Sequence, residues 1–179
     1  APYHKGVIDI EIRSTLNSIK NQVLLDNTQD LQAVQSVMIS GLASLAEYRD
    51  PETGEHIKRT QNYVKALAIT LKRKGLSLDE LTSEKIEAIY MSVPLHDIGK
   101  IGIRDEILLK AGRLTKEEFE QMKNHTTLGY EAISNVGSKL KNNEFLNYAS
   151  DVAHTHHERY DGTGYPTGLK GEEIPLVGR

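Results

Sequence analysis

The apolar residues of this chain recur at helical spacing, and the alternating pattern typical of β-strands is nearly absent. We predict a helix from about residue 26 to residue 48, and Leu24, just before it, recurs with Leu31, Met38 and Leu45 every seven residues. Such a stripe needs an apolar partner surface, and we expect it to pack on the bundle of its own domain. The alternative is a short parallel dimer helix that continues from an upstream domain.

Breakers and caps predict where the other helices begin and end. The sequence DPETG at residues 50–54 precedes a second helix that reaches about Lys74. A third helix starts near Ser83, and Pro94 predicts a kink or local opening just before His96, because proline cannot donate to the carbonyl four residues back. Further helices are expected at residues 115–124, 126–136 and 143–158. Two capping boxes are expected as well, one formed by Ser77 with Glu80 and one by Thr115 with Glu118. We therefore expect an all-α fold, a helical bundle.

Length and composition narrow the class of protein. The 179 residues suffice for one well-buried core, and the net charge of -3 argues against an extended surface for polynucleotides. No apolar run approaches the roughly 20 residues that a membrane span needs. The chain has no cysteine, which excludes disulfides, thiolate metal sites and a cysteine nucleophile. We expect a cytoplasmic protein in which nitrogen and oxygen atoms hold any metal.

Histidines mark the candidate chemistry. Glu52 and His56 are four residues apart and share one helix face, and Asp97, next to His96, could bridge two ions with its two oxygens. A bundle can collect such ligands from facing helices around one interior point. His154 is half a turn from the following histidine pair and is expected to point elsewhere. Six of the seven histidines stand near a predicted helix end or beside an acid: residues 56, 96, 125, 154, 156 and 157.

Five motifs of the chain carry a further signal. They are DPETGEH at 50–56, HDIGK at 96–100, LKAGRLTKEEFEQMKNH at 109–125, NHT at 124–126 and HHERYDGTGYP at 156–166. In their order and spacing, these motifs together resemble the HD-GYP family of bacterial cyclic di-GMP phosphodiesterases. The resemblance covers about residues 35–179 and implies a bundle of the HD-domain type with an N-terminal linker helix.

This resemblance assigns roles to individual residues. It implies catalytic roles for His96, Asp97 and Lys100, with Lys100 also contacting a substrate phosphate. It implies two or three divalent transition metals, with Fe or Mn favoured and Ni or Zn chemically plausible. The implied metal ligands are Glu52, His56, His96, Asp97, His125, His156 and His157.

The glycine-rich loop after the histidine pair receives its own set of roles. Gly164, Tyr165 and Pro166 are implied to shape the substrate loop, to bind substrate and to contact diguanylate cyclase domains. Arg159 and Asp161 also match the family, and we expect them to stabilise the loop.

The implied activity is metal-assisted hydrolysis of cyclic di-GMP to pGpG and further to GMP. One alternative is cleavage of another phosphoester, such as a mixed cyclic dinucleotide. Another is a catalytically silent receptor or interaction module for a cyclic dinucleotide. The silent module is an option because the aspartate that completes such sites beyond the GYP loop has no counterpart after His157, so we expect the C-terminal helices of the domain to be missing.

The first residues predict the context of the domain. Residues 1–16 are similar to the closing segment of a response-regulator receiver domain. We therefore expect residues 1–34 to be the tail of an upstream domain plus a linker helix, and residues 35–179 to be the HD-GYP domain. The same helix would serve a homodimer.

Overall fold

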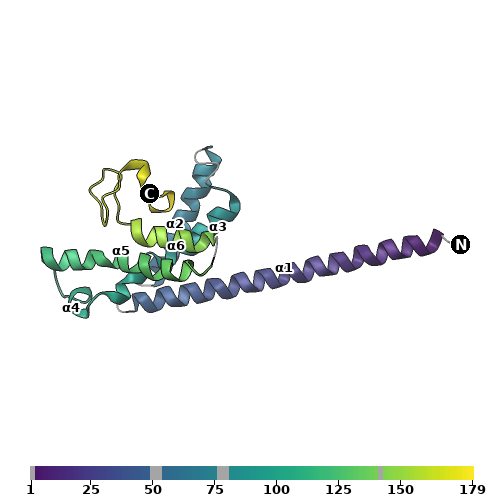
Figure 1. The fold of residues 1–179 in the computed structure, drawn as a ribbon, viewed down its shortest axis with the longest axis horizontal. Helices are drawn as coiled ribbons and strands as arrows, with labels where there is room; N and C mark the ends of the chain where they lie inside the picture. Colours follow the sequence, from purple (N-terminus) through teal and green to yellow (C-terminus); the bar gives the residue numbers. More distant parts are fainter. Residues whose placement is uncertain (1–2, 49–53, 76–80, 141–142) are drawn as a thin grey trace. The chain divides into compact units, whose positions relative to one another are not determined.

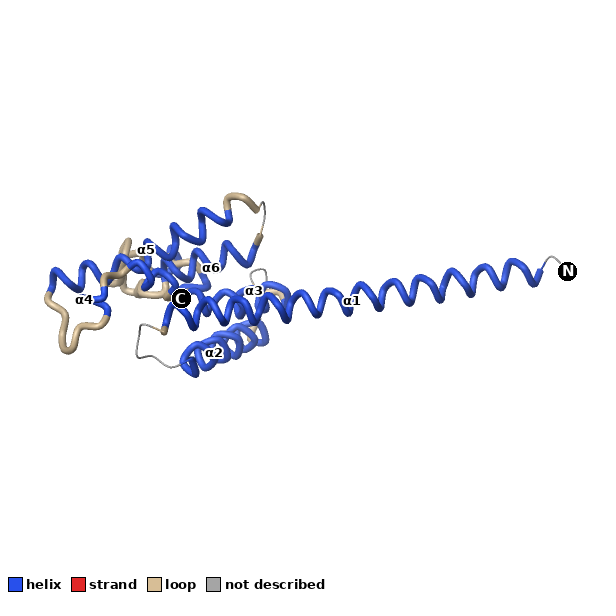
Figure 2. Tube along the Cα trace, turned by 90° about the horizontal axis from the view of Figure 1, so that it is seen from below, coloured by secondary structure: helices blue, strands red, loops and turns tan. Residues whose placement is uncertain are grey.

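The computed structural model describes residues 3–48, 54–75, 81–140 and 143–179, with side chains from residue 13, and contains only helices and loops there (Figures 1 and 2). The all-α prediction is confirmed. The α-helices are α1 (Tyr3–Glu47), α2 (Gly54–Arg73), α3 (Ser83–Ser92), α4 (Asp105–Leu108), α5 (Lys116–Gly137) and α6 (Glu144–Thr155). Short 3-10 helices are η1 (Val93–Leu95), η2 (Ile98–Gly102), η3 (Gly171–Glu173) and η4 (Leu176–Gly178). Among the described residues, no helix is both long and apolar enough to cross a bilayer.

Helix α1 begins far upstream of the position expected from the sequence, so the predicted start near residue 26 is wrong. No proline interrupts residues 3–47, and the polar residues near the expected start form bonds along the helix instead of capping it. Gln22 Nε2 donates to Asp26 at 2.9 Å, and Thr28 Oγ1 donates to the carbonyl of Leu24 at 2.7 Å. Hydrogen bonds between residues four positions apart satisfy these polar side chains within the helix, so the side chains do not end it.

The chain divides into two compact units, residues 1–38 and residues 39–179. The part of α1 in the second unit buries Ile39, Ala43 and Ala46, whereas Leu45 remains 69% exposed. Within residues 39–47, the bundle therefore buries a different face of α1 from the one that carries Leu45, contrary to our expectation for this residue. The domain boundary predicted after residue 34 stays a prediction.

Within residues 39–179, α5 packs against α6, and α3 packs against both α6 and α2 (Figure 1). Two apolar clusters stabilise this arrangement. The first contains Ile39, Leu95, Ile133, Ala149 and Ala153, and the second contains Ala68, Leu81, Ile86 and Ile89.

Several predicted boundaries are confirmed. Helix α2 ends at Arg73, before Gly75 with φ of 72°. Helix α3 begins at Ser83, and Pro94 lies in η1, where the α-helix gives way to a 3-10 turn before His96. The capping box of Thr115 and Glu118 is present at the start of α5. The other expected capping box, Ser77 with Glu80, lies outside the described residues.

Two predicted boundaries are wrong. Helix α5 runs unbroken through residues 124–126, because Thr126 is fully buried and its hydroxyl donates to the carbonyl of Lys123 at 2.9 Å instead of capping a new helix. Helix α6 ends at Thr155, three residues earlier than expected. Because α6 ends at Thr155, His156 and His157 lie outside the regular helix.

Candidate metal centre

Asp97 occupies the turn between η1 and η2, which packs against α5. The close approach depends on Gly99, because a Cβ on this residue would lie 1.9 Å from the carbonyl oxygen of His125 and 2.5 Å from the amide nitrogen of Gly129. Only glycine fits this contact between backbones. The HDIGK sequence therefore holds Asp97 directly beside α5.

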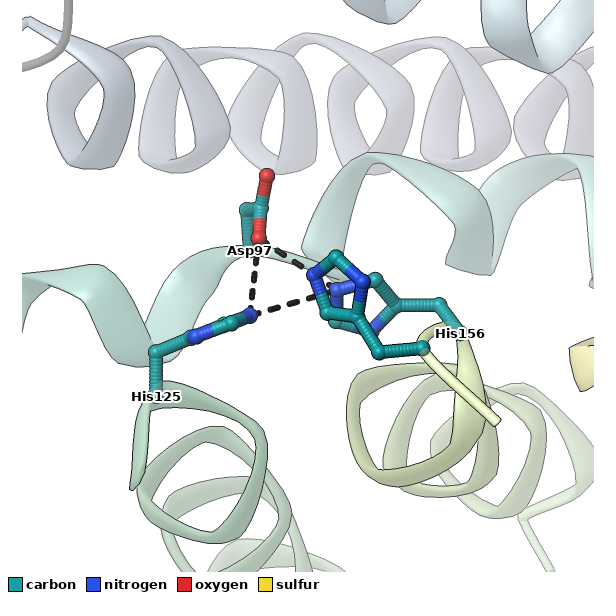
Figure 3. A group of neighbouring side chains, drawn as sticks. Asp97, His125 and His156 are labelled. Carbon is teal, nitrogen blue, oxygen red and sulfur yellow. Dashed lines mark hydrogen bonds and ion pairs between the residues drawn. The ribbon is translucent and has the colours of Figure 1, made fainter. Parts of the chain in front are cut away.

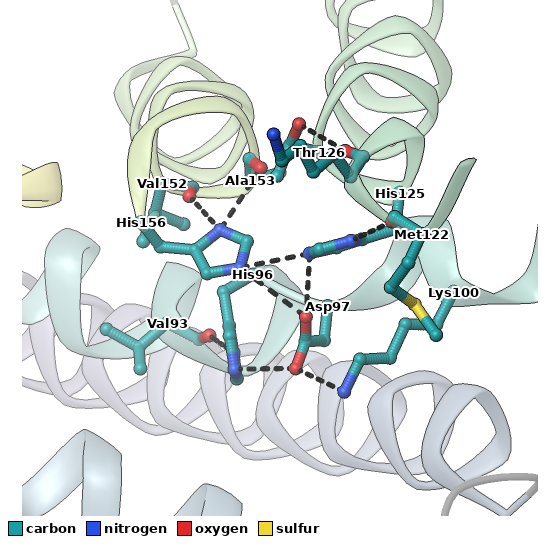
Figure 4. Close-up of polar contacts among 11 residues, drawn as sticks. Val93, His96, Asp97, Lys100, Met122, His125, Thr126, Val152, Ala153 and His156 are labelled. Atoms are coloured by element: carbon teal, nitrogen blue, oxygen red, sulfur yellow. Dashed lines mark hydrogen bonds and ion pairs between the residues drawn. The ribbon is translucent and has the colours of Figure 1, made fainter. Parts of the chain in front are cut away.

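Three histidines from three different elements surround Asp97 (Figure 4). Each Nδ1 lies near a backbone carbonyl about one turn earlier: His96 near Val93 at 2.9 Å, His125 near Met122 at 2.7 Å, and His156 near Val152 at 2.9 Å. A carbonyl can only accept, so each Nδ1 carries the proton and donates it. When such a ring is neutral, the lone pair of Nε2 lies on its opposite side.

These three Nε2 atoms face the carboxylate of Asp97. His125 and His156 lie 3.3 and 3.4 Å from Oδ1 (Figure 3), and His96 lies 3.1 Å from Oδ2. The Nε2 atoms of His125 and His156 are 3.3 Å apart. Oδ1 is buried and receives no hydrogen bond. In neutral rings these lone pairs and the carboxylate repel one another unless a proton or a metal ion lies between them.

The pKa shifts of His125, His157 and Asp97 favour the forms of these groups that bind metal. Burial lowers the pKa of His125 and lowers that of His157 to about 3, so both rings are neutral near pH 7. Burial alone would raise the pKa of Asp97, but the imidazoles of His156 and His96 and the charge of Lys100 outweigh it and lower that pKa. His96 is the exception: burial lowers its pKa, but the Asp97 carboxylate outweighs burial and raises that pKa, so a metal ion would have to displace a proton from this ring.

The donor set fits a divalent transition metal. Asp97, His125, His156 and His157 each offer a ligand atom, and these atoms all lie within 4.8 Å of one another. Imidazole nitrogen with carboxylate oxygen suits iron, manganese, nickel or zinc. The Nδ1 bonds to carbonyls orient three of the rings, as is usual for histidines that bind metal.

Other predicted residues lie at different distances from this cluster. The ring of His56, near the start of α2, lies 6.3 Å from that of His96 between centroids. Lys100 Nζ lies 3.0 Å from Asp97 Oδ2, on the side away from Oδ1. His154 stacks on Tyr130 at 4.6 Å and stays apart from the cluster, as expected. The predicted ligand Glu52 lies outside the described residues.

The loop after the histidine pair forms one wall of a pocket of about 380 Å³. Gly164 and Tyr165 line it, and a Cβ on Gly164 would lie 2.3 Å from the amide nitrogen of Arg159. The Tyr165 ring stacks on His157 at 4.6 Å, and burial raises its pKa to about 12. Pro166, joined to Tyr165 by a cis peptide bond, is exposed and lies outside the lining.

Asp161 forms hydrogen bonds within the loop, as expected for a residue that stabilises it, whereas Arg159 makes only an exposed ion pair, which adds little stability. Asp161 Oδ1 accepts hydrogen bonds from the backbone and hydroxyl of Thr163, at 2.9 and 2.6 Å. Arg159 Nε lies 3.7 Å from the same oxygen. The hydrogen bonds from Thr163 lower the pKa of Asp161.

Sequence reasoning missed Glu158, although this acid directly follows the histidine pair. It is buried, and its Oε1 accepts from the backbone and hydroxyl of Thr167 at 2.8 and 2.7 Å and from the amide of Gly168 at 3.1 Å. Glu158 thereby ties the far side of the loop to the end of α6. Its position inside the motif was the available signal.

Comparison with known proteins matches residues 40–179 to the HD domain family. A cyclic di-GMP phosphodiesterase of Vibrio cholerae is 49% identical over 164 residues, which are 90% of this chain and 33% of that protein. The cyclic di-GMP phosphodiesterase response regulator RpfG of Xanthomonas campestris is 39% identical over 95% of this chain and 43% of its own length. A 3'3'-cGAMP-specific phosphodiesterase 2 of Vibrio cholerae is 35% identical over 84% of this chain and 26% of its own length. The chain thus spans less than half the length of these relatives.

Proposed function

The chain belongs to the HD domain family, and on that premise we propose that it is a metal-dependent phosphodiesterase of the HD-GYP type that hydrolyses cyclic di-GMP to pGpG and further to GMP. The observation that carries this proposal is the convergence of three imidazole lone pairs on the buried carboxylate of Asp97. The printed names of two similar proteins, both cyclic di-GMP phosphodiesterases, support the choice of substrate.

In this proposal the two oxygens of Asp97 would each help to hold a divalent ion, because they face different histidines. Oδ1 would act with His125, His156 and His157, and Oδ2 with His96. Bound divalent ions supply a strong nucleophile from water at neutral pH and neutralise charge on the phosphate. Iron or manganese fits the nitrogen and oxygen donors, and nickel and zinc fit them as well. His56 and Glu52 complete the proposed ligand set.

The protein's own groups orient the reaction. The three Nδ1–H groups donate to backbone carbonyls, which fixes the rings with Nε2 toward the site. Lys100, held 3.0 Å from Asp97 and largely buried, brings an ammonium group to the edge of the cluster. We propose that the Lys100 ammonium contacts the non-bridging oxygens of the cleaved phosphate, because a fixed positive charge there stabilises the transition state.

Elemental analysis of protein purified without oxygen, together with a chromatographic assay of cyclic di-GMP breakdown, tests the proposal. We expect two or more transition metals per chain and the appearance of pGpG. Absence of bound metal after metal reconstitution, with the dinucleotide intact, would contradict it.

A mixed cyclic dinucleotide is the second candidate substrate, and the similarity to a 3'3'-cGAMP-specific phosphodiesterase favours testing it. Parallel measurement of kcat/KM for 3'3'-cGAMP and cyclic di-GMP separates the two, and we expect the larger value for cyclic di-GMP. Tight binding of either compound without hydrolysis by the metal-loaded protein would indicate the silent receptor instead.

We also propose that α1 pairs with α1 of a second copy. Leu24, Leu31, Met38 and Leu45 are each more than half exposed and repeat every seven residues, as a parallel coiled coil requires. Sedimentation analysis should show a dimer that dissociates in Leu24→Lys, Leu31→Lys protein. An unchanged sedimentation coefficient would contradict the pairing.

The proposed contact with diguanylate cyclase domains rests on the family resemblance and on the exposure of Pro166 in the loop of Gly164, Tyr165 and Pro166. Mixing the protein with a purified cyclase domain and measuring binding by calorimetry tests it directly.

A further inference from the structure

The pocket beside the metal centre contains groups that the proposed chemistry does not use. The pocket shares His156 and His157 with the cluster, and Tyr165 lines it beside them. Its other side is lined by Phe119 and Lys123, from the N-terminal half of α5. Its volume of about 380 Å³ falls within the range of roughly 300–1,000 Å³ usual for small-molecule sites. The pocket is therefore large enough to hold part of a substrate whose reacting bond lies at the cluster.

Lys123 is held in this pocket by three contacts. Its Nζ lies 5.1 Å from the ring centroid of Phe119 and 5.3 Å from that of Tyr165, both within the range of cation–π attraction. The same ammonium donates to Glu120 at 2.7 Å. Because the Glu120 side chain is 67% exposed, water competes strongly for that bond. An anionic ligand can therefore replace it while the aromatic rings keep the ammonium in place.

Tyr165 links Lys123 to the metal centre. The ring stacks on His157 with an interplanar angle of 20°, and it meets Phe119 edge to face at 6.1 Å. His157 belongs to the cluster around Asp97. A ligand in contact with both Lys123 and His157 would therefore lie beside the Tyr165 ring.

The charges of the lining favour an anion. Lys123 is cationic, and so is Arg159, which lies 3.7 Å from Asp161 in an exposed pair. The one acid of the lining, Glu158, is directed into the loop through Oε1, and its Oε2 is buried. A cyclic dinucleotide carries two phosphodiester groups on opposite sides of its ring. Only one of them is cleaved at the metal centre at a time, so the other needs a cation outside the cluster.

We infer that Lys123 binds the second, uncleaved phosphate of the cyclic dinucleotide, and that the exposed Phe119 ring beside it contacts the adjoining sugar or base. This inference rests on the proposed function, because it presumes a substrate with two phosphates. Lys123 is thus a positioning and specificity residue, which favours cyclic dinucleotides over phosphodiesters with one phosphate.

The test compares Lys123→Met and Lys123→Arg with Lys116→Met, a control at an exposed lysine of the same helix. Each protein is assayed for kcat/KM on cyclic di-GMP and on bis(4-nitrophenyl) phosphate, which has one phosphate, and for the Kd of cyclic di-GMP. In Lys123→Met we expect kcat/KM for cyclic di-GMP to fall roughly 10- to 100-fold more than for the one-phosphate substrate, mainly through KM. Lys123→Arg should restore part of the loss, and Lys116→Met should match wild type on both substrates.

Equal losses on the two substrates, or no loss on either, would overturn the inference. If wild-type protein binds cyclic di-GMP without hydrolysing it, the proposed function fails, and the Kd decides the inference: a weaker Kd in Lys123→Met supports it, and an unchanged Kd overturns it. If wild-type protein neither binds nor hydrolyses cyclic di-GMP, both fail.

Discussion

At the scale of single residues, the chemistry of the site depends on which atoms each side chain leaves available. Asp97 is ionised and buried, and its two oxygens face different neighbours: two histidines on one side, His96 and Lys100 on the other. A buried charge of this kind is stable only when cations surround it. Lys100 provides one, and the donors around Oδ1 indicate the place of another.

Asp97→Asn should abolish metal binding at the centre. The amide keeps the size of the side chain but removes the charge and leaves one oxygen where two ligands are needed. We expect metal content to drop by at least one ion per chain and turnover of cyclic di-GMP to drop by about 100-fold or more, since even groups that support metal ligands contribute roughly 10- to 100-fold. Elemental analysis and the chromatographic assay measure both.

The matched control is Asp105→Asn, which changes an exposed acid at the start of α4 and should leave both values at the wild-type level. Full metal content in folded Asp97→Asn protein would contradict the bridging role.

Glu158→Ala should lower stability by about 1–3 kcal/mol, because it removes the buried carboxylate that accepts the hydrogen bonds of Thr167 and Gly168. Thermal denaturation measures the loss. Glu172→Ala provides the comparison, since the Glu172 side chain is 86% exposed and its removal should change stability by no more than about 0.5 kcal/mol. Equal melting temperatures for the two variants would show that Glu158 does not hold the loop.

At the scale of the elements, the site depends on how closely η2 approaches α5. Gly99 and Gly129 lie face to face in this contact, where a Cβ on Gly129 would lie 3.3 Å from the amide nitrogen of Gly99. The approach brings Asp97 to His125, which is 28 residues further along the chain. Close backbone packing, and not a long side chain, therefore sets the width of the metal centre.

Gly99→Ala should separate these elements. The added methyl group meets the carbonyl of His125, which cannot move without disturbing α5, and we expect a loss of about 1–3 kcal/mol or more in the free energy of unfolding together with weaker metal binding. Chemical denaturation and metal titration measure the two effects.

Gly41→Ala is the matched control, because a Cβ there meets nothing within 4 Å and alanine favours helix by up to about 1 kcal/mol. A Gly99→Ala protein as stable as wild type, with unchanged metal affinity, would contradict the packing argument.

Element boundaries show where sequence reasoning works and where it fails. Pro94 and the Thr115 capping box act through their nearest neighbours, and both predictions are confirmed. Thr126 was expected to start a helix, but burial against neighbouring elements keeps it inside α5. A residue that favours a cap in isolation can satisfy its hydroxyl within a helix once tertiary packing covers it.

At the scale of the whole molecule, the metal centre joins the elements of residues 39–179. Its ligands come from the turn before η2, from α5 and from the end of α6. A ligand that binds only the folded state stabilises that state by mass action. Metal should therefore stabilise this unit as a whole and not one helix.

Removal of metal by a chelator should lower the melting temperature of the protein. Metal present at 100 times its Kd contributes about 2.7 kcal/mol, and this contribution disappears when the chelator takes the ion. Differential scanning calorimetry with and without the chelator measures the shift. Asp97→Asn protein, which lacks the bridging carboxylate, should show little or no shift, and an equal shift in both proteins would point to metal bound elsewhere.

The sequence by itself determined the all-α class, most helix boundaries and the types of ligand available, because helical periodicity, caps and the absence of cysteine are local or compositional properties. It also indicated the candidate ligands, through motifs whose order is visible along the chain. Only the tertiary structure decided which of them meet: the Nε2 atoms of His125 and His156 lie 3.3 Å apart although the residues are 31 positions apart. Likewise, only packing between distant segments joins Lys123 and Tyr165 in one pocket and buries Glu158 beneath the loop. Such contacts depend on how helices pack against one another, and no local pattern in the sequence encodes that distance.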